Sequence, residues 1–339
     1  MLIKKMVKFI TTILFLAFFV FGSTVAETRN ESFSLWLEDF KKRAVIRGIS
    51  EATVENALSE AIFLPKVIEY DRFQPEFYED TYTYIKKRTS SEKVRKGIRL
   101  YKKEEKIINQ IEKIFLVEKE LLIALMGIET NFGKYLGKMD IISSLATLSY
   151  DKRRSEFFSN ELLILLELLD KKIIDKKILY GSWAGAFGNF QFMPSTIMNY
   201  AIDYNKNSDI ELKKIEDSFA SAANYISKIG WKKNEPCFDR VQLKKDIPKK
   251  YLNTSAKKLK NKVKLRSLKK YLKDNEPIRF KETSLVAVIT PDKDIVPNSD
   301  NLSPAFIVSG NYEQILKWNR SLRFALAVCT LKEKIRNEL

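Results

Sequence analysis

Apolar residues recur at three- and four-residue steps over several stretches of this chain, a period that predicts amphipathic helices. Gly48 interrupts the first of these stretches and Ser50 follows as a candidate N-cap, so two helices are expected there. Pro194 stands at a first-turn position and would open a short helix. The expected helices cover residues 32–60 in two parts, 91–115, 118–128, 154–169, 194–200, 217–229 and 312–335. The last of them is expected to pack back on the others through its apolar face.

The pattern changes in the last third of the chain. Residues 244–273 contain thirteen Lys or Arg and a single acid, while 284–290 and 304–309 carry the β-branched and apolar residues of short strands. We therefore expect a mainly α fold of the α+β type, with a separate, basic and partly β lobe over 236–310. The basic run indicates either a solvated face or an electrostatic grip on an anionic cell-wall polymer.

The amino-terminal stretch has the pattern of a secretory signal peptide. Lys4, Lys5 and Lys8 precede an uncharged apolar run over 9–21, and small residues follow up to Ala26. The apolar run is shorter than the ~20 residues that a membrane-spanning helix needs, although an uncleaved anchor is the alternative. We expect cleavage after residue 26 and a periplasmic protein. No cysteine lies near this site, so no amino-terminal lipid anchor is expected.

Composition narrows the chemistry that this chain can perform. The 339 residues are 45% hydrophobic and 12% aromatic, as in a folded globular protein. The absence of histidine excludes Ser-His and Cys-His nucleophilic catalysis and His-ligated zinc, so proton transfer must use carboxylates, Lys, Tyr or Cys. Cys237 and Cys329 allow at most one disulfide. The net charge of +17 favours an anionic partner, cell-wall polymer or membrane surface rather than nucleic acid.

One glutamate stands where a catalytic acid would be expected. Glu129 falls in the last turn of the helix predicted to begin at 118, directly after an apolar run. The negative end of the helix dipole and the scarcity of water both raise the pKa of a carboxyl at such a position. A carboxyl that is still protonated near neutral pH is what a general acid requires. The alternative is a glutamate that frays into solvent.

A second candidate feature is the segment GSWAGAFGNFQFMPS at 181–195. It places three glycines within eight positions, interleaved with Trp183, Phe187, Phe190 and Phe192. Glycine permits close backbone approach, and aromatic rings offer flat apolar faces on which sugar rings stack. The segment therefore predicts one wall of a groove for a flat, polar ligand. The alternative is a packing turn between helices.

Four segments in this order closely resemble the lytic murein transglycosylases of the B type: IETNFG at 128–133, SLATLSY at 144–150, GSWAGAFG at 181–188 and QFMPS at 191–195. Further similarity, at 36–37, 70–74 and 318–319, extends the resemblance over nearly all of the chain. It implies a lysozyme-like helical core with an additional helical lobe and a small β lobe. The expected parts are a signal peptide at 1–26, a helical lobe at 27–115, the lysozyme-like core at 116–235, the basic lobe at 236–310 and a C-terminal helix at 311–339.

The resemblance also implies a reaction, cleavage of the β-1,4 bond between N-acetylmuramic acid and N-acetylglucosamine in peptidoglycan. Glu129 is expected to act alone, first giving a proton to the glycosidic oxygen and then taking one from the muramyl 6-hydroxyl, which closes a 1,6-anhydro ring without water. A hydrolase of the same bond would need a second carboxylate, for which Asp140 and Asp151 are available. A catalytically silent, peptidoglycan-binding scaffold is the third interpretation. No cofactor is required for this reaction, and we expect a monomer.

The resemblance implies six further residues at the substrate. Two of them are expected to contact the muramyl unit near the cut, and the others match sugar-contact positions of the family. Trp318 stands where a relative carries Tyr, which keeps a stacking face and loses the hydroxyl. The six residues are Ser182, Gln191, Tyr84, Tyr225, Trp318 and Asn319.

Residues 203–211 have oxygen-bearing side chains at the first, third and fifth positions of a calcium loop. Ser208 replaces the usual turn glycine, and Lys214 occupies the twelfth position, where a bidentate Glu is expected. Some relatives close a variant loop with a later aspartate. The sequence therefore leaves open a solvated polar turn or a structural calcium site remote from the chemistry, formed by Asp203, Asn205, Asn207, Asp209 and Asp217.

Overall fold

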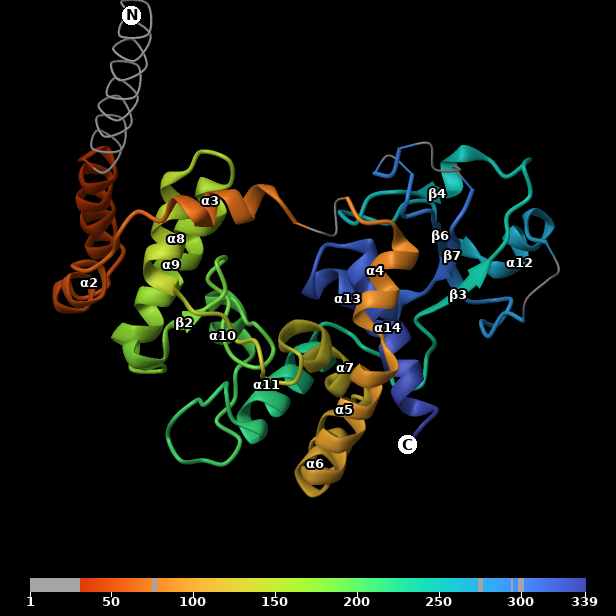
Figure 1. Ribbon diagram of the computed structural model, residues 1–339, viewed down its shortest axis with the longest axis horizontal. Helices are drawn as coiled ribbons and strands as arrows, with labels where there is room; N and C mark the ends of the chain where they lie inside the picture. Colours follow the sequence, from red (N-terminus) through yellow and green to blue (C-terminus); the bar gives the residue numbers. More distant parts are fainter. Residues whose placement is uncertain (1–30, 75–77, 274–276, 294, 298–301) are drawn as a thin grey trace, which may run out of the picture. The chain divides into compact units, whose positions relative to one another are not determined.

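The computed structural model describes residues 31–74, 78–273, 277–293, 295–297 and 302–339 (Figure 1). The predicted signal peptide at 1–26 lies outside these residues. Across the part of the chain that the structure describes, no helix is both long enough and apolar enough to cross a membrane. The described chain is mainly helical and also contains short strands, as the sequence predicted.

The chain forms two compact units, each assembled from segments that are far apart in the sequence. The first contains residues 31–69, Met139–Leu179 and Trp183–Gly185. The second contains Tyr70–Lys138, Tyr180–Ser182 and Ala186–Leu339. Glu129 and all six expected substrate-contact residues belong to the second unit. These units cut across the parts expected from the sequence, since both the helical lobe (27–115) and the core (116–235) contribute to both units; the five-part division stays a prediction.

The first unit is built on helices and an aromatic cluster. Its first helix ends at residue 46, and the Ser50 side chain accepts a hydrogen bond from the backbone N–H of Thr53, which confirms the predicted N-cap. The Trp36 ring of the first helix packs against the Tyr150 ring, with the two ring centroids 5.9 Å apart. The elements are α2 (Glu51–Leu58), the start of α3 (Pro65–Arg72), β1 (Met139–Asp140), α8 (Ile141–Tyr150), α9 (Ser155–Asp170) and η2 (Lys176–Ile178).

The helices of the second unit surround α7 (Lys119–Thr130), which is buried over most of its length. The prediction over 194–200 is confirmed by α10, whose bounds are the same. The stretch predicted over 91–115 forms two helices because Glu104 ends one and begins the next. The other elements are β2 (Tyr180–Gly181), α4 (Thr81–Arg88), α5 (Ser91–Lys103), α6 (Glu105–Phe115), α10 (Pro194–Tyr200), α11 (Ile215–Lys228), α13 (Gly310–Trp318) and α14 (Leu322–Arg336).

The predicted strands over 284–290 and 304–309 are confirmed and form the centre of a small sheet. The strand order is β3-β7-β6-β4, with β5 also paired to β6. All pairs are antiparallel except β4 with β6. Its elements are β3 (Phe238–Val241), β4 (Leu252–Asn253), β5 (Val263–Lys264), β6 (Leu285–Ile289) and β7 (Ala305–Val308), with η3 (Lys249–Tyr251), α12 (Leu265–Leu268) and η4 (Lys269–Tyr271) between them.

The C-terminal helix α14 packs on α7, α4 and α5, which confirms the expectation that the apolar face of the chain's end is covered by the other helices. The helical stretch predicted over 312–335 is interrupted, because Asn319 ends α13 and the Ser321 side chain caps α14. A disulfide between Cys237 and Cys329 joins the start of the small sheet to α14, with the two Cα atoms 6.2 Å apart.

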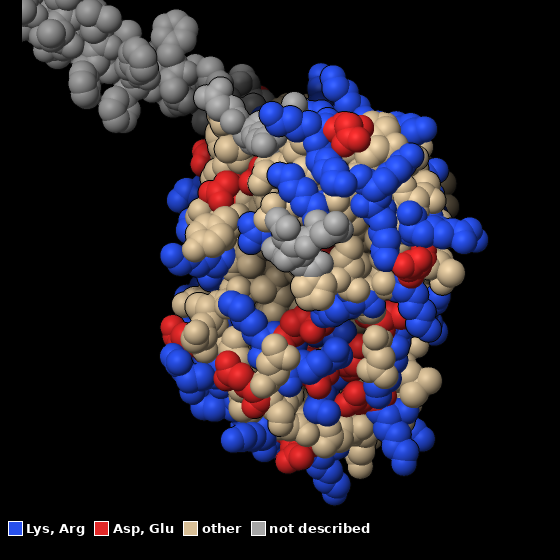
Figure 2. Space-filling model, turned by 90° about the vertical axis from the view of Figure 1, so that its right-hand side faces the viewer, with Lys and Arg blue, Asp and Glu red and all other residues tan. Residues whose placement is uncertain are grey.

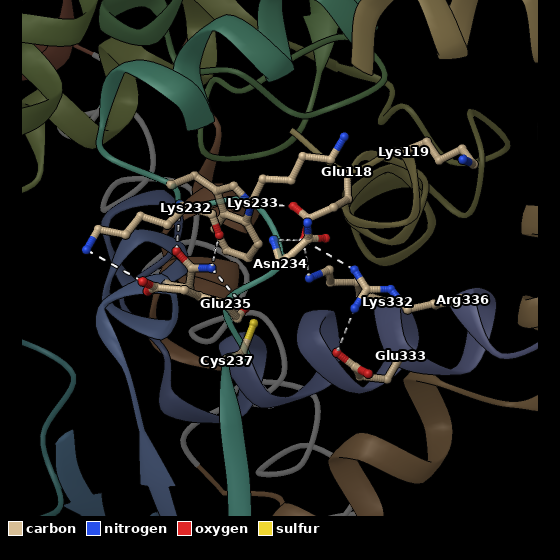
Figure 3. Close-up of polar contacts among 12 residues, drawn as sticks. Glu118, Lys119, Lys232, Lys233, Asn234, Glu235, Cys237, Lys332, Glu333 and Arg336 are labelled. Carbon is tan, nitrogen blue, oxygen red and sulfur yellow. Dashed lines mark hydrogen bonds and ion pairs between the residues drawn. The ribbon is translucent and has the colours of Figure 1, made fainter. Parts of the chain in front are cut away.

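A buried ion pair also fixes α14 to the start of α7 (Figure 3). The Lys332 ammonium lies 2.8 Å from a Glu118 carboxylate oxygen, and the two side chains are 1% and 2% exposed. The Trp231 indole N–H and the Asn234 backbone N–H donate to the same carboxylate, which Arg336 also reaches at 3.2 Å. Burial alone would raise the pKa of Glu118, but the Lys332 charge and the hydrogen bonds of Lys332 and Trp231 hold it below the usual value.

Breaking this pair from one side should destabilise the fold. In Lys332→Met the Glu118 carboxylate stays buried without its closest cation, so the free energy of unfolding is expected to fall by about 3 kcal/mol. The double variant Glu118→Gln/Lys332→Met removes both charges and is expected to recover part of this loss. Urea unfolding at pH 7 measures both changes. A double variant that is less stable than Lys332→Met would contradict the prediction.

The same pair predicts a pH dependence. Because the pKa of Glu118 is lower in the folded state, the ionised carboxylate stabilises the fold fully above its unfolded pKa of about 4.5. This contribution is lost as the pH falls through the folded-state pKa. The stability difference between the unmodified protein and Glu118→Gln should therefore narrow in acid, in urea titrations from pH 7 to pH ~3.

Candidate functional site

Glu129 is the second-last residue of α7 and lies in its last turn, as expected. The chain reverses directly after the helix because three successive residues, Asn131, Phe132 and Gly133, have φ of 50°, 63° and 78°. The backbone N–H groups of Asn131 and Phe132 both donate to the Met126 carbonyl and close the helix. The turn that carries Glu129 is therefore capped rather than frayed, and the glutamate is half-buried.

Two contacts hold this helix end in place. The Phe132 ring folds back on Gly127, where a Cβ atom would come within 2.7 Å of the ring. The Thr130 hydroxyl donates to the Asn189 carbonyl at 2.8 Å and accepts the Gly133 N–H at 3.0 Å. Since Thr130 is fully buried, these bonds satisfy a polar group inside the core. They also join the end of α7 directly to the glycine-aromatic segment.

The glycine-aromatic segment folds into a tight loop. The backbone groups of Phe187 and Phe192 exchange two hydrogen bonds, and Gly188 has a φ of 80° and lies against Leu212. Phe187, Phe190 and Phe192 are between 1% and 3% exposed. The expectation that these three rings offer open stacking faces is therefore wrong. They are core side chains, since the loop turns them inward, and Phe190 and Phe192 form a floor beneath other aromatic residues.

The exposed part of this aromatic group comes from other helices. Trp318, at the end of α13, packs on Phe192 at 5.4 Å and stacks on Tyr225 at 5.1 Å with an interplanar angle of 25°. Tyr225 in turn stacks on Tyr200 at 4.5 Å. Trp318, Tyr225 and Tyr200 are all half-buried. These three rings, which we call the aromatic ladder, stack on one another and are each partly exposed.

Trp318 connects this ladder to Glu129. Its indole N–H donates to Glu129 Oε1 at 2.9 Å. The resemblance implied that tryptophan at this position loses a hydroxyl, and in this chain the indole N–H supplies a hydrogen bond to the carboxylate. An indole N–H can donate but cannot accept, so Glu129 Oε1 is the acceptor in this bond.

Tyr225 remains a neutral donor over the physiological pH range. Burial, with a smaller effect of Tyr200, raises its pKa to about 12. Its hydroxyl donates to the Lys317 carbonyl at 3.3 Å.

Tyr200 was not among the predicted site residues. It is the last residue of α10, and only the packing of α10 on α11 brings its ring to Tyr225, so no local sequence signal indicates it.

Ser182 and Gln191 each stabilise a turn of the glycine-aromatic segment. The Ser182 hydroxyl accepts the Ala186 N–H at 3.1 Å, which closes the turn that begins the glycine-aromatic segment. Gln191 has a left-handed backbone with a φ of 50°, and its amide donates to the carbonyls of Gly188 and Leu136. Gln191 follows Phe190 directly and thus lies in the same loop as the ladder's floor.

Asn319 and Tyr84 differ in where they lie. Asn319 directly follows Trp318 as the C-cap of α13. Tyr84 is 3% exposed on α4 and carries the Arg88 guanidinium 3.5 Å from its ring centroid. A cavity of about 740 Å³ over this part of the chain is lined by residues that include Tyr82, Lys86 and Lys334, but not by Tyr84. The structure therefore brings Glu129, Trp318, Tyr225, Asn319 and Gln191 near one another and leaves Tyr84 in the core.

Asp140 and Asp151, the two candidates for a second carboxylate, both lie at the ends of α8 in the first unit. The Asp140 carboxylate accepts the backbone N–H groups of Ile142 and Ser143 as an N-cap. The Asp151 carboxylate accepts the N–H of Arg153 at the other end of the helix. Both carboxylates thus take part in local helix-end structure.

The predicted calcium loop is largely satisfied by its own backbone. Asp203 accepts the N–H groups of Asn207 and Ser208, and Asp217, which is fully buried, accepts those of Tyr204 and Glu211. Across the described chain, no group of three or more Asp, Glu, Cys or His side chains is arranged to hold a metal ion. The oxygen donors suit a hard cation in type, but their engagement with backbone amides makes the loop a poor chelator.

The packing of Phe132 gives a direct test of how α7 ends. In Gly127→Ala the new methyl group must displace the Phe132 ring, so the free energy of unfolding is expected to fall by about 1–3 kcal/mol despite the better helix propensity of alanine. Gly310→Ala, where the new methyl group meets nothing within 4 Å, is the matched control and should leave the free energy of unfolding unchanged. Urea unfolding compares the two; equal stability of both variants would show that the Phe132 contact does not fix the helix end.

The comparisons with known proteins agree with this geometry. The sequence matches the family described as Transglycosylase SLT domain over residues 32–333. It is 36% identical over 153 residues to Membrane-bound lytic murein transglycosylase B of Escherichia coli K12. That match covers 45% of this chain and 42% of the relative, less than half of the relative's length.

Solved structures match over most of the chain. SltB3 from Pseudomonas aeruginosa, in complex with NAG-anhNAM-pentapeptide, has a TM-score of 0.77 and 29% identity, covering 90% of this chain and 79% of that one. The Escherichia coli lytic transglycosylase Slt35, in complex with calcium, has a TM-score of 0.73 and 26% identity, covering 89% and 93%. These matches confirm the predicted lysozyme-like fold class. The chain belongs to the transglycosylase SLT domain family.

Proposed function

We propose that this protein is a lytic transglycosylase that cleaves the β-1,4 bond between N-acetylmuramic acid and N-acetylglucosamine in peptidoglycan and leaves 1,6-anhydromuramyl ends. The observation that carries the proposal is the hydrogen bond from the Trp318 indole to Glu129, which joins a half-buried carboxyl to an aromatic ladder. The bound NAG-anhNAM-pentapeptide of the similar SltB3 contains an anhydro sugar, which supports this chemistry.

In the proposed mechanism Glu129 acts first as an acid and then as a base. Protonated Glu129 gives its proton to the glycosidic oxygen as the bond breaks, and its carboxylate then takes the proton of the muramyl 6-hydroxyl. The indole N–H of Trp318 fixes the orientation of the carboxyl and stabilises the carboxylate between the two steps. The substrate's own N-acetyl group shares the positive charge that develops at the anomeric carbon, as in substrate-assisted glycosidases.

Hydrolysis of the same bond is the weaker alternative. A water-consuming glycosidase ordinarily uses a second carboxylate. Asp140 and Asp151, the candidates from the sequence, both accept backbone N–H groups at the ends of α8. The aromatic ladder instead supplies partly exposed aromatic rings beside Glu129, which suit the apolar faces of sugar rings.

The proposed setting is the periplasm, which the protein would reach through its cleaved signal peptide. The substrate is the peptidoglycan strand, the protein is proposed to act as a monomer, and no cofactor takes part in the reaction.

We further propose that residues 203–217 bind calcium weakly, with a purely structural effect; the calcium complex of the similar Slt35 supports this assignment.

Glu129→Gln tests the proposed function. The amide cannot donate an acidic proton, so release of soluble products from purified peptidoglycan is expected to fall by at least about a thousandfold while the melting temperature stays the same. Mass spectrometry of the products of the unmodified protein should find muropeptides lighter by one water than reducing-end products. Reducing ends would favour the hydrolase, and binding without products would favour a scaffold.

Trp318→Phe tests the role of the indole N–H. The ring stays in the ladder, but the bond to Glu129 is lost, so kcat/KM on a soluble glycan is expected to fall by about 10- to 100-fold, in line with the ~1.5–3 kcal/mol of a hydrogen bond to a charged group. Trp36→Phe, which changes a ring of the first unit's aromatic cluster, is the control and should stay within about twofold. An unchanged rate in Trp318→Phe would remove Trp318 from the mechanism.

Calcium should stabilise the protein slightly without affecting turnover. For a Kd of about 1 mM, ~5 mM calcium adds about 1 kcal/mol to the free energy of unfolding. Thermal melting with calcium and with chelator measures this shift, and Asp203→Asn should abolish it. Loss of activity on chelation would contradict a structural role.

A further inference from the structure

The basic residues of 244–273 form a strongly charged surface on the small lobe of the second unit. The segment provides twelve of the seventeen net positive charges of the whole chain. All thirteen of its Lys and Arg side chains are exposed. Figure 2 looks onto the side where β4, β6 and α12 lie in Figure 1, and shows Lys and Arg crowded over the upper part of this face, whereas acids gather in its lower part. We call these thirteen residues the basic surface.

Folding does not account for these charges. The buried side chains of the same segment, such as Leu265, Leu268 and Leu272, form the lobe's core together with β6 and β7. The charged residues occupy the positions between them that point outward. A mixture of acids and bases would solvate such a face equally well and would avoid repulsion between like charges.

Most of the basic surface has no acidic partner. Lys262 lies 2.8 Å from Glu313, and Lys269 pairs with Glu282. The other eleven cations have no carboxylate within 4 Å among the residues that the structure describes. On other helices exposed cations are often paired, as Lys171 is with Glu167. The basic surface therefore carries charge that an external anion can neutralise.

The centre of this surface is well ordered by contacts between three chain segments. Lys244 Nζ donates to the Lys270 carbonyl at 3.0 Å. Tyr251 and Tyr271 lie with their rings 6.2 Å apart, and the ammonium groups of Lys250 and Lys270 lie 5.2 and 4.9 Å from these rings. Lys250 and Lys270 thus lie over one tyrosine pair in cation–π contacts, and Lys244 is held beside them through the Lys270 carbonyl.

The residue types indicate the kind of partner. Twelve of the thirteen cations are Lys, which offers compact, hydrated charges on flexible stems and suits many separate anions better than one bidentate site. Leu285 is the one large apolar side chain of the described part of 236–310 that is strongly exposed, so the lobe offers little to insert into a bilayer. A flexible polymer with repeated carboxylates fits these properties best.

We propose that the basic surface, centred on Lys244, Lys250 and Lys270, binds the carboxylate-bearing peptides of peptidoglycan and so holds the polymer while Glu129 cleaves it. The inference rests on the proposed function for the identity of the polymer. None of the thirteen residues is among those around Glu129. Binding at a second surface raises the local concentration of glycan and matters for the insoluble polymer, not for short soluble glycans.

Charge reversal at the centre of the surface tests this proposal. The variant Lys244→Glu/Lys250→Glu/Lys270→Glu is compared with Lys102→Glu/Lys106→Glu/Lys113→Glu, which changes three exposed lysines of α5 and α6 by the same total charge. Both are made in the Glu129→Gln background, and sedimentation with purified insoluble peptidoglycan measures affinity at ~0.1 M salt. The first variant should bind at least about tenfold more weakly, and the control within about twofold of the parent.

Three further measurements make the result decisive. With Glu129 intact, the first variant should cleave a short soluble glycan at a rate within about twofold of the unmodified protein, which also verifies its fold. Binding of the parent to insoluble peptidoglycan should weaken steeply between ~0.05 and ~0.3 M salt, and no salt dependence would overturn the proposal. The third measurement is the binding of the parent and both triple variants to vesicles of phosphatidylcholine with about one-third phosphatidylglycerol.

The outcomes separate this inference from the proposed function. Equal loss of peptidoglycan binding in both triple variants, or no loss in either, overturns the basic surface as a binding site. A loss confined to the vesicles makes the partner a membrane and also overturns it. If the surface binds peptidoglycan but the unmodified protein releases no anhydro products, the proposed function fails and the binding surface stands.

Discussion

The helix α7 is the element on which the second unit depends, because it is buried over most of its length and a glutamate at each end is held by another helix. Glu118 at its start is held by the Lys332 ammonium of α14. Glu129 in its last turn is held by the Trp318 indole of α13. Because apolar contacts are not directional, polar contacts at its ends specify the rotation and axial position of an apolar helix more sharply than burial alone. The two polar contacts supply that direction, and the capped end at Phe132 keeps the last turn in place.

The site shows how a chain without histidine can arrange proton transfer. One carboxyl must serve as acid and as base, so its neighbours should hold it without competing for its proton. The indole N–H of Trp318, which donates to Glu129, meets that condition because it does not give up its proton near neutral pH. The buried rings of Phe190 and Phe192 position the ladder from below rather than contacting a ligand themselves.

Local patterns in the sequence predicted much of the fold but only part of the site. Ser50 and Pro194 mark helix starts through backbone chemistry that depends on a few neighbours, and both were identified correctly. The interruption at Glu104 was missed because the apolar period continues across it. The bond between Trp318 and Glu129 spans 189 positions, and the ring of Tyr200 reaches Tyr225 only through helix packing. The pairing of Cys237 with Cys329 likewise follows from tertiary structure and not from spacing.

A lone carboxyl that gives its proton to the leaving oxygen and regains one from the substrate's own 6-hydroxyl adds no atom of solvent to the products. Digestion of peptidoglycan in oxygen-18-labelled water therefore tests the account most directly. The account predicts muramyl products whose anomeric carbon carries no label. Incorporation of one labelled oxygen at that carbon would contradict it and would identify the enzyme as a hydrolase.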